Sequence, residues 1–356
     1  MHAPVKGLVQ GSDWHAQHPE PDSTRSLPHI VPIDFVAESE QRSGSAVRRM
    51  NLRQKLHEAR AEHADDKRRY KLLYLFAGPA RKGDAEDVGR KLGMDVVCYD
   101  IQRSKHHNLL DDLIWDGIVT DVKAGVYDGV LMAPPCGTFC RARRCNGPTG
   151  PRSIRTIFKP YGVKDMSPQE KEAARVGTAL ALRALDMAGI CESQGIPWLV
   201  ETSGKYRAVL NLFQLPEYSA FRAACPRAII HDMVQCPFGS LTVKPTILLT
   251  TMKMGKLPKT CPHPPKWWRM PWSGRWIFAP HPPLIGTQVA VEAARWHPGM
   301  KRRAQPKGEF ISKKAAYYTP QLNQLLLESF LDNRDTPREQ EVHQRPAKKR
   351  RQRLQD

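Results

Sequence analysis

Short apolar runs alternate with polar segments along the middle of the chain, and four of the runs have the length of one buried strand. They lie at residues 72–78, 94–100, 129–133 and 197–203, and glycine, proline or polar residues follow them. Segments with helical spacing lie between several of them. This alternation predicts an α/β domain with a mostly parallel sheet and helices on both of its faces.

Three helices are indicated by their caps and by their spacing. Asp84 is positioned to cap the first, and Ser167 with Glu170 forms a capping box at the start of a long second helix. Apolar residues then recur at helical spacing until Gly195, which ends the helix. A third helix is predicted over residues 315–333.

The C-terminal half is less regular. Residues 204–227 predict an irregular helical excursion, and residues 229–236 and 246–250 predict a pair of β-strands. Residues 258–283 are rich in proline, tryptophan and cations, and they predict a non-repetitive insert. Its aromatic residues would either stack on bases or form a hydrophobic plug.

Composition sets the predicted domain boundaries. Residues 1–70 comprise an aperiodic arm, predicted to be disordered, and a densely charged helix. Residues 71–332 form the folded domain, with the insert near 255–285. Residues 333–356 form a basic, disordered tail that contains a Lys/Arg cluster typical of nuclear import or nucleic-acid binding. We therefore expect a nuclear protein if the source is eukaryotic and a cytoplasmic one otherwise.

The charge balance indicates a polyanionic partner. The chain has 356 residues and a formal net charge of +19, which favours nucleic acid over an anionic membrane surface. No apolar run is long enough to cross a bilayer, and the first residues lack the apolar core of a signal peptide. The eight cysteines are scattered, so we interpret them as reduced thiols. Cys261 and His263 lack paired Cys-x-x-Cys spacing, so no metal is predicted. A monomer is expected.

The functional prediction depends on residues 129–140. Pro134 and Pro135 end the buried strand because neither has an N–H for the sheet ladder, so Cys136 follows at the carboxyl end of the strand. In open α/β sheets that edge holds ligands and catalytic groups. Taken alone, Cys136 is more often a small buried hydrophobe. Glu201 ends another buried strand, and a buried carboxylate requires a partner or a role.

The first two strands carry a cofactor signal. Gly78 follows the first strand, and Asp100 ends the second one 22 residues later. A glycine lets the backbone approach a nucleotide-like ligand, and the acid can accept hydrogen bonds from ribose hydroxyls. The full Gly-x-Gly-x-x-Gly pattern is missing, which favours an adenosyl cofactor over a dinucleotide. Asp111 or Asp112 either reaches an adenine amino group or caps a short helix or loop over residues 109–119.

A cationic loop follows Cys136. It suits closure over a phosphate backbone, and a solvated loop is the equally weighted alternative. Its cations are Arg141, Arg143, Arg144, Arg152, Arg155 and Lys159.

The order of these motifs resembles the DNA cytosine-5 methyltransferase family. LYLFAG at 73–78 is similar to its cofactor loop, APPCGTF at 133–139 to its Pro-Pro-Cys motif, and VET at 200–202 to its Glu-Asn-Val motif. Residues 313–330 loosely resemble its last motif. Residues 238–250 stand where the family has Gln-x-Arg-x-Arg, and in this they look more like divergent viral or mobile-element relatives.

The resemblance implies a class I methyltransferase fold and S-adenosyl-L-methionine as cofactor. It implies that Cys136 is the nucleophile that adds to carbon 6 of cytosine, and that Glu201 acts at ring nitrogen 3. The residues implied to bind the cofactor are Phe76, Ala77, Gly78, Asp100, Asp111 and Pro134. Phe76 would stack on the adenine, Gly78 would pass the methionine portion, and Asp100 would bind the ribose. The residues assigned to the substrate are Arg141, Arg143 and Lys244.

The predicted activity is therefore cytosine-5 methylation of DNA. RNA as the substrate and a catalytically inactive nucleic-acid-binding relative are the alternatives. A methyltransferase for proteins or small molecules would leave the net charge of +19 unexplained.

Overall fold

The computed structural model describes residues 69–139, 152–204, 210–270, 273–283, 291–295 and 316–334. All of these belong to one compact unit. The predictions for the arm, the charged helix, Arg141, Arg143 and the basic tail lie outside the described residues.

A six-stranded sheet forms the centre of this unit, with strand order β2-β1-β3-β4-β6-β5. The first four strands in this order are parallel, and β6 is antiparallel to both of its neighbours. The strands are β1 (Lys71–Leu75), β2 (Asp95–Tyr99), β3 (Gly129–Met132), β4 (Trp198–Ser203), β5 (Ile229–Val234) and β6 (Pro245–Thr250). The four predicted strands and the predicted β-pair are confirmed, and the sheet is compatible with a Rossmann-like fold.

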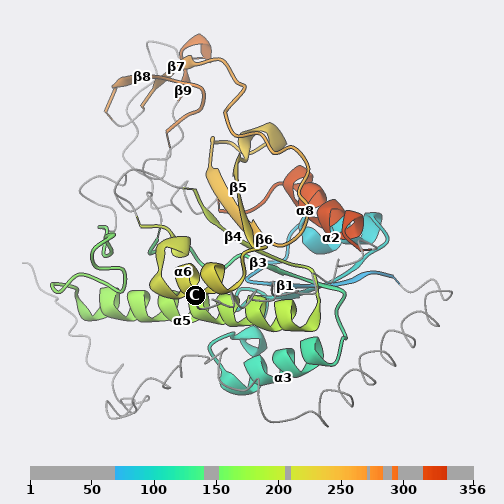
Figure 1. The fold of residues 1–356 in the computed structure, drawn as a ribbon. Helices are drawn as coiled ribbons and strands as arrows, with labels where there is room; N and C mark the ends of the chain where they lie inside the picture. Colours follow the sequence, from blue (N-terminus) through green and yellow to red (C-terminus); the bar gives the residue numbers. More distant parts are fainter. Residues whose placement is uncertain are drawn as a thin grey trace, which may run out of the picture. The chain divides into compact units, whose positions relative to one another are not determined.

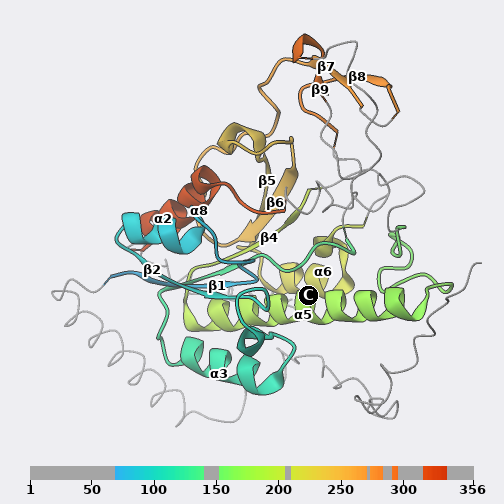
Figure 2. The same ribbon diagram turned by 180° about the vertical axis from the view of Figure 1, so that it is seen from behind.

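Helices cover both faces of the sheet (Figures 1 and 2). Helices α3 and α5 pack on one face and α2 and α8 on the other, each pair in mutual contact. The helices are α2 (Ala85–Lys91), α3 (Asp112–Lys123), α5 (Pro168–Gln194), α6 (Pro216–Ala224) and α8 (Pro320–Asp332). Short 3-10 turns cover Lys105–His107, Leu212–Gln214, Cys236–Phe238 (η5) and Ala293–Arg295. Among the described residues, no helix is long and apolar enough to cross a membrane.

The predicted caps are confirmed. The Asp84 side chain accepts a hydrogen bond from the Asp87 N–H, and Ser167 and Glu170 form both bonds of the capping box. Gly195 ends α5 in the left-handed conformation, with φ +75°. The last helix begins at Pro320 rather than at residue 315, because Thr319 caps it and proline suits its first turn.

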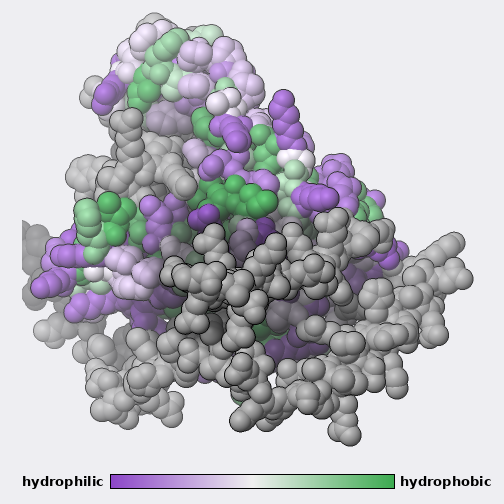
Figure 3. Space-filling model, viewed as in Figure 1, coloured by the Kyte–Doolittle hydropathy of each residue, from purple (hydrophilic) through white to green (hydrophobic). Residues whose placement is uncertain are grey.

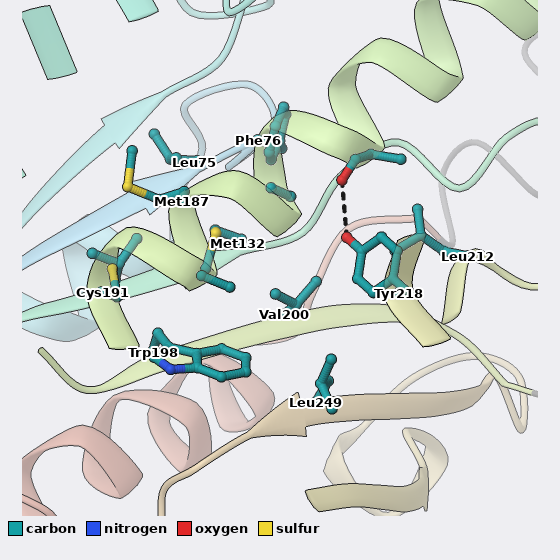
Figure 4. Packing of buried hydrophobic residues seen from close by; sticks show 14 of the residues in the cluster. Leu75, Phe76, Met132, Met187, Cys191, Trp198, Val200, Leu212, Tyr218 and Leu249 are labelled. Carbon is teal, nitrogen blue, oxygen red and sulfur yellow. Dashed lines mark hydrogen bonds between the residues drawn. The ribbon is translucent and has the colours of Figure 1, made fainter. Parts of the chain in front are cut away.

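Two apolar cores lie on the two faces of the sheet, and the larger one joins the sheet to α3, α5 and α6 (Figure 4). Trp198 of β4 is fully buried in it, with its indole N–H 3.1 Å from a Glu192 carboxylate oxygen. The Tyr218 hydroxyl of α6 donates to the Ala181 carbonyl oxygen of α5 at 2.9 Å (Figure 4). Such bonds satisfy the polar ends of buried aromatic residues.

The insert is more regular than predicted. Its described part contains β7 (Lys266–Arg269) and β8 (Trp276–Ala279), which form an antiparallel three-stranded sheet with β9 (Val291–Glu292), a strand beyond the predicted insert, in the order β8-β7-β9. The prediction of a non-repetitive insert is therefore wrong. The strands have two to four residues and lie among prolines, so they are too short to show a clear alternating pattern.

Candidate functional site

The carboxyl edge of the parallel strands brings the predicted site residues together. Residues 76–78 follow β1, Asp100 follows β2, and Cys136 lies four residues beyond the end of β3. Glu201 is in the second half of β4. Because β2, β1, β3 and β4 are parallel neighbours, all of these segments reach the same edge of the sheet.

The loop after β1 is held by Asp100. Its carboxylate accepts hydrogen bonds from the backbone N–H of Gly78 and of Gln102, both at 2.8 Å. Gly78 has φ +72°, a conformation that glycine adopts without strain. Asp100 therefore shapes the predicted cofactor loop, and each of its oxygens keeps further acceptor capacity for a ligand hydroxyl.

Arg103 also supports this loop, and the sequence prediction missed it. Its Nε donates to the Gly78 carbonyl oxygen at 2.9 Å, and its other nitrogens lie 2.7 Å from Asp84 and 2.9 Å from Glu86. Burial acts to raise the pKa of the Asp84 carboxyl, but backbone hydrogen bonds and Arg103 outweigh it and lower the pKa. This role has no signal in the sequence, because Arg103 is distant in the chain from the two acids that it contacts.

Residues 316–318, just before α8, approach the cofactor loop. The Arg81 guanidinium donates to the Tyr318 carbonyl oxygen at 2.5 Å and lies 5.0 Å from the centre of the Tyr317 ring. A Cβ atom at Gly78 would be 3.6 Å from that ring. The predicted cofactor loop is thus in contact with the segment that resembles the family's last motif.

Glu201 is buried beside a cation and a phenol. Burial raises the pKa of its carboxyl, while the Lys244 ammonium and the Tyr318 hydroxyl act to lower it. The Tyr318 hydroxyl is itself buried and forms no hydrogen bond of normal geometry. The Lys244 Nζ donates to the Ala316 carbonyl oxygen at 2.8 Å and lies 5.0 Å from the centre of the Tyr318 ring.

Cys136 belongs to the same electrostatic neighbourhood. Burial lowers the pKa of Lys244, and negative charge on Glu201 and on Cys136 acts to raise it. Charge on Cys136 also acts on the Tyr318 hydroxyl, whose pKa is raised chiefly by burial and by Glu201. Cys136 is partly exposed. The thiol and the acid are therefore both close enough to Lys244 and Tyr318 to influence the ionisation of these two groups.

Two residues at this edge of the sheet have a strained backbone. Among the described residues, Phe76 and Lys244 are the non-glycine residues with positive φ, at +64° and +39°. Such conformations are costly and concentrate at functional sites. Phe76 is 8% exposed and packs in the larger core, and the predicted cofactor residues Ala77 and Pro134 are also buried.

The turn after Cys136 rests on a buried arginine. The Phe139 N–H donates to the Cys136 carbonyl oxygen at 2.8 Å. Arg155 is 2% exposed, donates to Thr138 Oγ1 at 3.1 Å and lies 4.0 Å from the centre of the Phe139 ring. It also donates to the carbonyl oxygens of Ala174 and Pro160, at 2.5 and 2.6 Å.

Both predictions for the cationic loop, closure over a phosphate backbone and a solvated loop, are therefore wrong for Arg155. Arg155 is a core residue, and Arg152 forms ion pairs with Asp165 and Glu170 at 2.7 and 2.8 Å. These contacts occupy both guanidinium groups.

Asp111 caps α3 by accepting a hydrogen bond from the Leu113 N–H at 3.0 Å, which bears out the capping alternative for this residue.

Two surface cavities lie away from the predicted cofactor residues. One of about 380 Å³ is lined by Met233, Thr246, Cys261 and neighbouring residues. Another of about 610 Å³ lies at Lys82, Asp87 and residues around them. No match to the chain was found among protein-family models, curated proteins or solved structures.

Replacing Glu201 by glutamine is expected to make folding stability less sensitive to high pH. Below about pH 4.5, the ordinary pKa of the group, the carboxyl is neutral in both the folded and the unfolded states. As the pH rises through the elevated folded-state pKa, the native protein must ionise a buried group that is already ionised when unfolded, so stability is lost. The stability of the Glu201→Gln variant relative to the wild type should therefore increase with pH, by about 1.4 kcal/mol per unit of pKa elevation.

Urea unfolding at pH 4 and pH 8 measures this difference. Glu172→Gln is the matched control, because a hydrogen bond from Arg175 lowers the pKa of the exposed Glu172 carboxyl. That variant should show a small effect of the opposite sign. An E201Q stability difference that is flat or falls with pH would contradict the raised pKa.

Proposed function

We propose that the protein transfers a methyl group from S-adenosyl-L-methionine to carbon 5 of cytosine in DNA, within a class I methyltransferase fold. The observation that carries this proposal is the shared electrostatic environment of Cys136, Glu201 and Lys244 at the carboxyl edge of the sheet. A nucleophilic sulfur, a buried acid and a cation are the groups that addition to cytosine requires.

The chemistry proceeds by addition and elimination. The Cys136 thiolate adds to carbon 6, and Glu201 in its protonated form, which burial favours by raising the pKa of its carboxyl, donates a hydrogen bond to ring nitrogen 3. This offsets the negative charge that moves into the ring and makes carbon 5 nucleophilic. Carbon 5 would then take the methyl group as the methyl–sulfonium bond of the cofactor breaks, leaving a neutral thioether. A base removes the proton from carbon 5, and the Cys136 thiolate leaves carbon 6 as the double bond between carbons 5 and 6 re-forms. Lys244 stabilises the thiolate before addition and after elimination.

The residues around Gly78 and Asp100 fit an adenosyl cofactor, which when bound supplies an electrophilic methyl group. Gly78 leaves room for a ligand near the backbone, and the Asp100 oxygens can each accept a further hydrogen bond from a ribose hydroxyl. Tyr317 and Arg81 border the same loop. They would contact the cofactor beside Gly78 and Asp100.

One face of the small sheet supports nucleic acid as the substrate. Strand pairing puts Trp267 opposite Phe278 and Arg269 opposite Trp276 on the same face. The Trp267 and Phe278 rings are 5.0 Å apart and more than half exposed, and the Arg269 guanidinium lies 5.1 Å from the Trp276 ring. Figure 3 shows apolar residues among weakly hydrophilic ones over this sheet. Exposed rings next to a cation suit base stacking and phosphate contact.

Trapping with fluorinated substrate tests the proposal. Oligonucleotides of mixed sequence with 5-fluorocytosine, made as DNA and as RNA, are incubated with the protein and S-adenosyl-L-methionine. Fluorine at carbon 5 blocks the final proton loss, so the adduct cannot resolve. We expect a covalent DNA adduct that peptide mass spectrometry maps to Cys136. An adduct with RNA alone would change the substrate, and DNA binding without an adduct would favour the inactive relative.

A further inference from the structure

Four metal-binding side chains meet between the central sheet and the small sheet. Cys236, Cys261, His263 and His281 each offer one ligand atom, and these atoms all lie within 4.8 Å of one another. Cys236 begins the 3-10 turn η5, directly after β5, and the other three come from the chain just before β7 and just after β8. The segments are far apart in sequence, since Cys261 follows Cys236 by 25 residues and His281 follows His263 by 18.

The contacts within this group are those of ligands around a common centre. Cys261 Sγ is 3.5 Å from His263 Nδ1, and the His263 and His281 rings lie edge to face with their centres 4.9 Å apart. An ion with bonds of about 2.0–2.3 Å and tetrahedral geometry spaces its ligand atoms roughly 3.3–3.8 Å apart. Binding would therefore require the four atoms to move together by about 1 Å at most.

His281 is oriented as metal-ligating histidines are. Its Nδ1 lies 3.1 Å from the Leu241 carbonyl oxygen. A carbonyl oxygen only accepts hydrogen bonds, so Nδ1 carries the proton and Nε2 keeps its lone pair. That Nε2 is buried and has no hydrogen-bond partner. A backbone carbonyl on one nitrogen and a metal on the other is the usual arrangement, and it fixes both the tautomer and the ring orientation.

We propose that Cys236, Cys261, His263 and His281 bind one zinc ion in a closed, structural site. Two thiolates and two imidazoles in tetrahedral reach favour zinc over magnesium or calcium, which prefer oxygen ligands. Four protein ligands leave no open position for a catalytic water. The ion joins the β5–β6 end of the central sheet to the strands that carry Trp267 and Phe278. The proposed zinc site replaces the prediction from the sequence that no metal is bound. It does not depend on the proposal that the protein methylates DNA.

Metal analysis of the reduced, full-length chain tests the site. We expect about one zinc per chain, with X-ray absorption showing two sulfur neighbours at about 2.3 Å and two nitrogen neighbours at about 2.0–2.1 Å. The variants Cys261→Ser and His281→Gln should each lose the stoichiometric zinc. Cys136→Ser should keep it, so the outcome is separate from that of the trapping experiment.

Three results would overturn the zinc site. The first is a wild-type chain that contains no zinc and binds none when zinc is added under reducing conditions. The second is an absorption spectrum without sulfur neighbours, which decides the question even if the two variants fail to fold. The third is full zinc content in both Cys261→Ser and His281→Gln.

Discussion

Serine in place of Cys136 is expected to abolish methyl transfer to DNA, lowering turnover by about 10⁴-fold or more, the scale typical for loss of a covalent nucleophile. The serine hydroxyl is nearly isosteric with the thiol, but it remains protonated near neutral pH and is a far weaker nucleophile. Cys136 is only partly buried. The free energy of unfolding should therefore change by less than about 1 kcal/mol.

Transfer of labelled methyl groups to mixed-sequence DNA measures this effect. Cys140→Ser is the matched control, because it makes the same atomic change four residues along the chain, and it should retain activity. Equal transfer by wild type and Cys136→Ser would remove Cys136 from the mechanism. Equal loss in both serine variants would show that the effect is not specific to the predicted nucleophile.

Alanine in place of Arg155 is expected to lower the free energy of unfolding by about 3–5 kcal/mol, the range for replacing a large buried side chain by alanine. The change removes the Arg155 hydrogen bonds to the carbonyl oxygens of Ala174 and Pro160 and opens a cavity beside Phe139, while the Thr178 hydroxyl still donates to the Ala174 carbonyl oxygen. Arg155→Lys should recover only part of the loss, because an ammonium group cannot reproduce the planar fork of donors.

Arg152→Ala is the control, since it removes an arginine three residues away whose ion pairs are exposed to solvent. Its side chain is 46% exposed, and such pairs contribute about 1 kcal/mol or less each. Chemical denaturation of the three variants ranks them directly. Comparable losses from Arg152→Ala and Arg155→Ala would contradict the assignment of Arg155 to the core.

Arg155 also supports the turn after Cys136. In the Arg155→Lys variant, a concentration of denaturant too low to unfold the protein should therefore already slow the formation of the Cys136 adduct.

Local signals explain what the sequence predicted well. The four parallel strands are apolar because helices cover both faces of the sheet, so they stand out as continuous runs. The caps at Asp84, Ser167 and Gly195 are equally local, since each depends on residues within one helical turn. These elements also brought Cys136 and Glu201 to the same edge, because parallel strand order alone is enough to align their ends.

The residues that were missed depend on contacts between distant segments. Arg155 and Arg152 look alike in the sequence, and contacts of Arg155 with other segments, such as Phe139 and the Ala174 carbonyl oxygen, distinguish the buried one. Tyr318 acquires its environment from Glu201, which lies in β4, and from Lys244, which directly precedes β6. The proposed zinc ligands Cys236, Cys261, His263 and His281 also come from segments distant in the sequence, so they show no compact metal-binding spacing.

The position of Tyr318 has a consequence for how the protein is made. The ammonium of Lys244 and the loop containing Arg81 both bind carbonyl oxygens of residues 316–318, which precede α8. A nascent chain still lacking that segment would leave Glu201 without its Tyr318 neighbour and Lys244 without its Ala316 acceptor. During translation, the proposed active site would therefore be completed only after the ribosome has added residues 316–318.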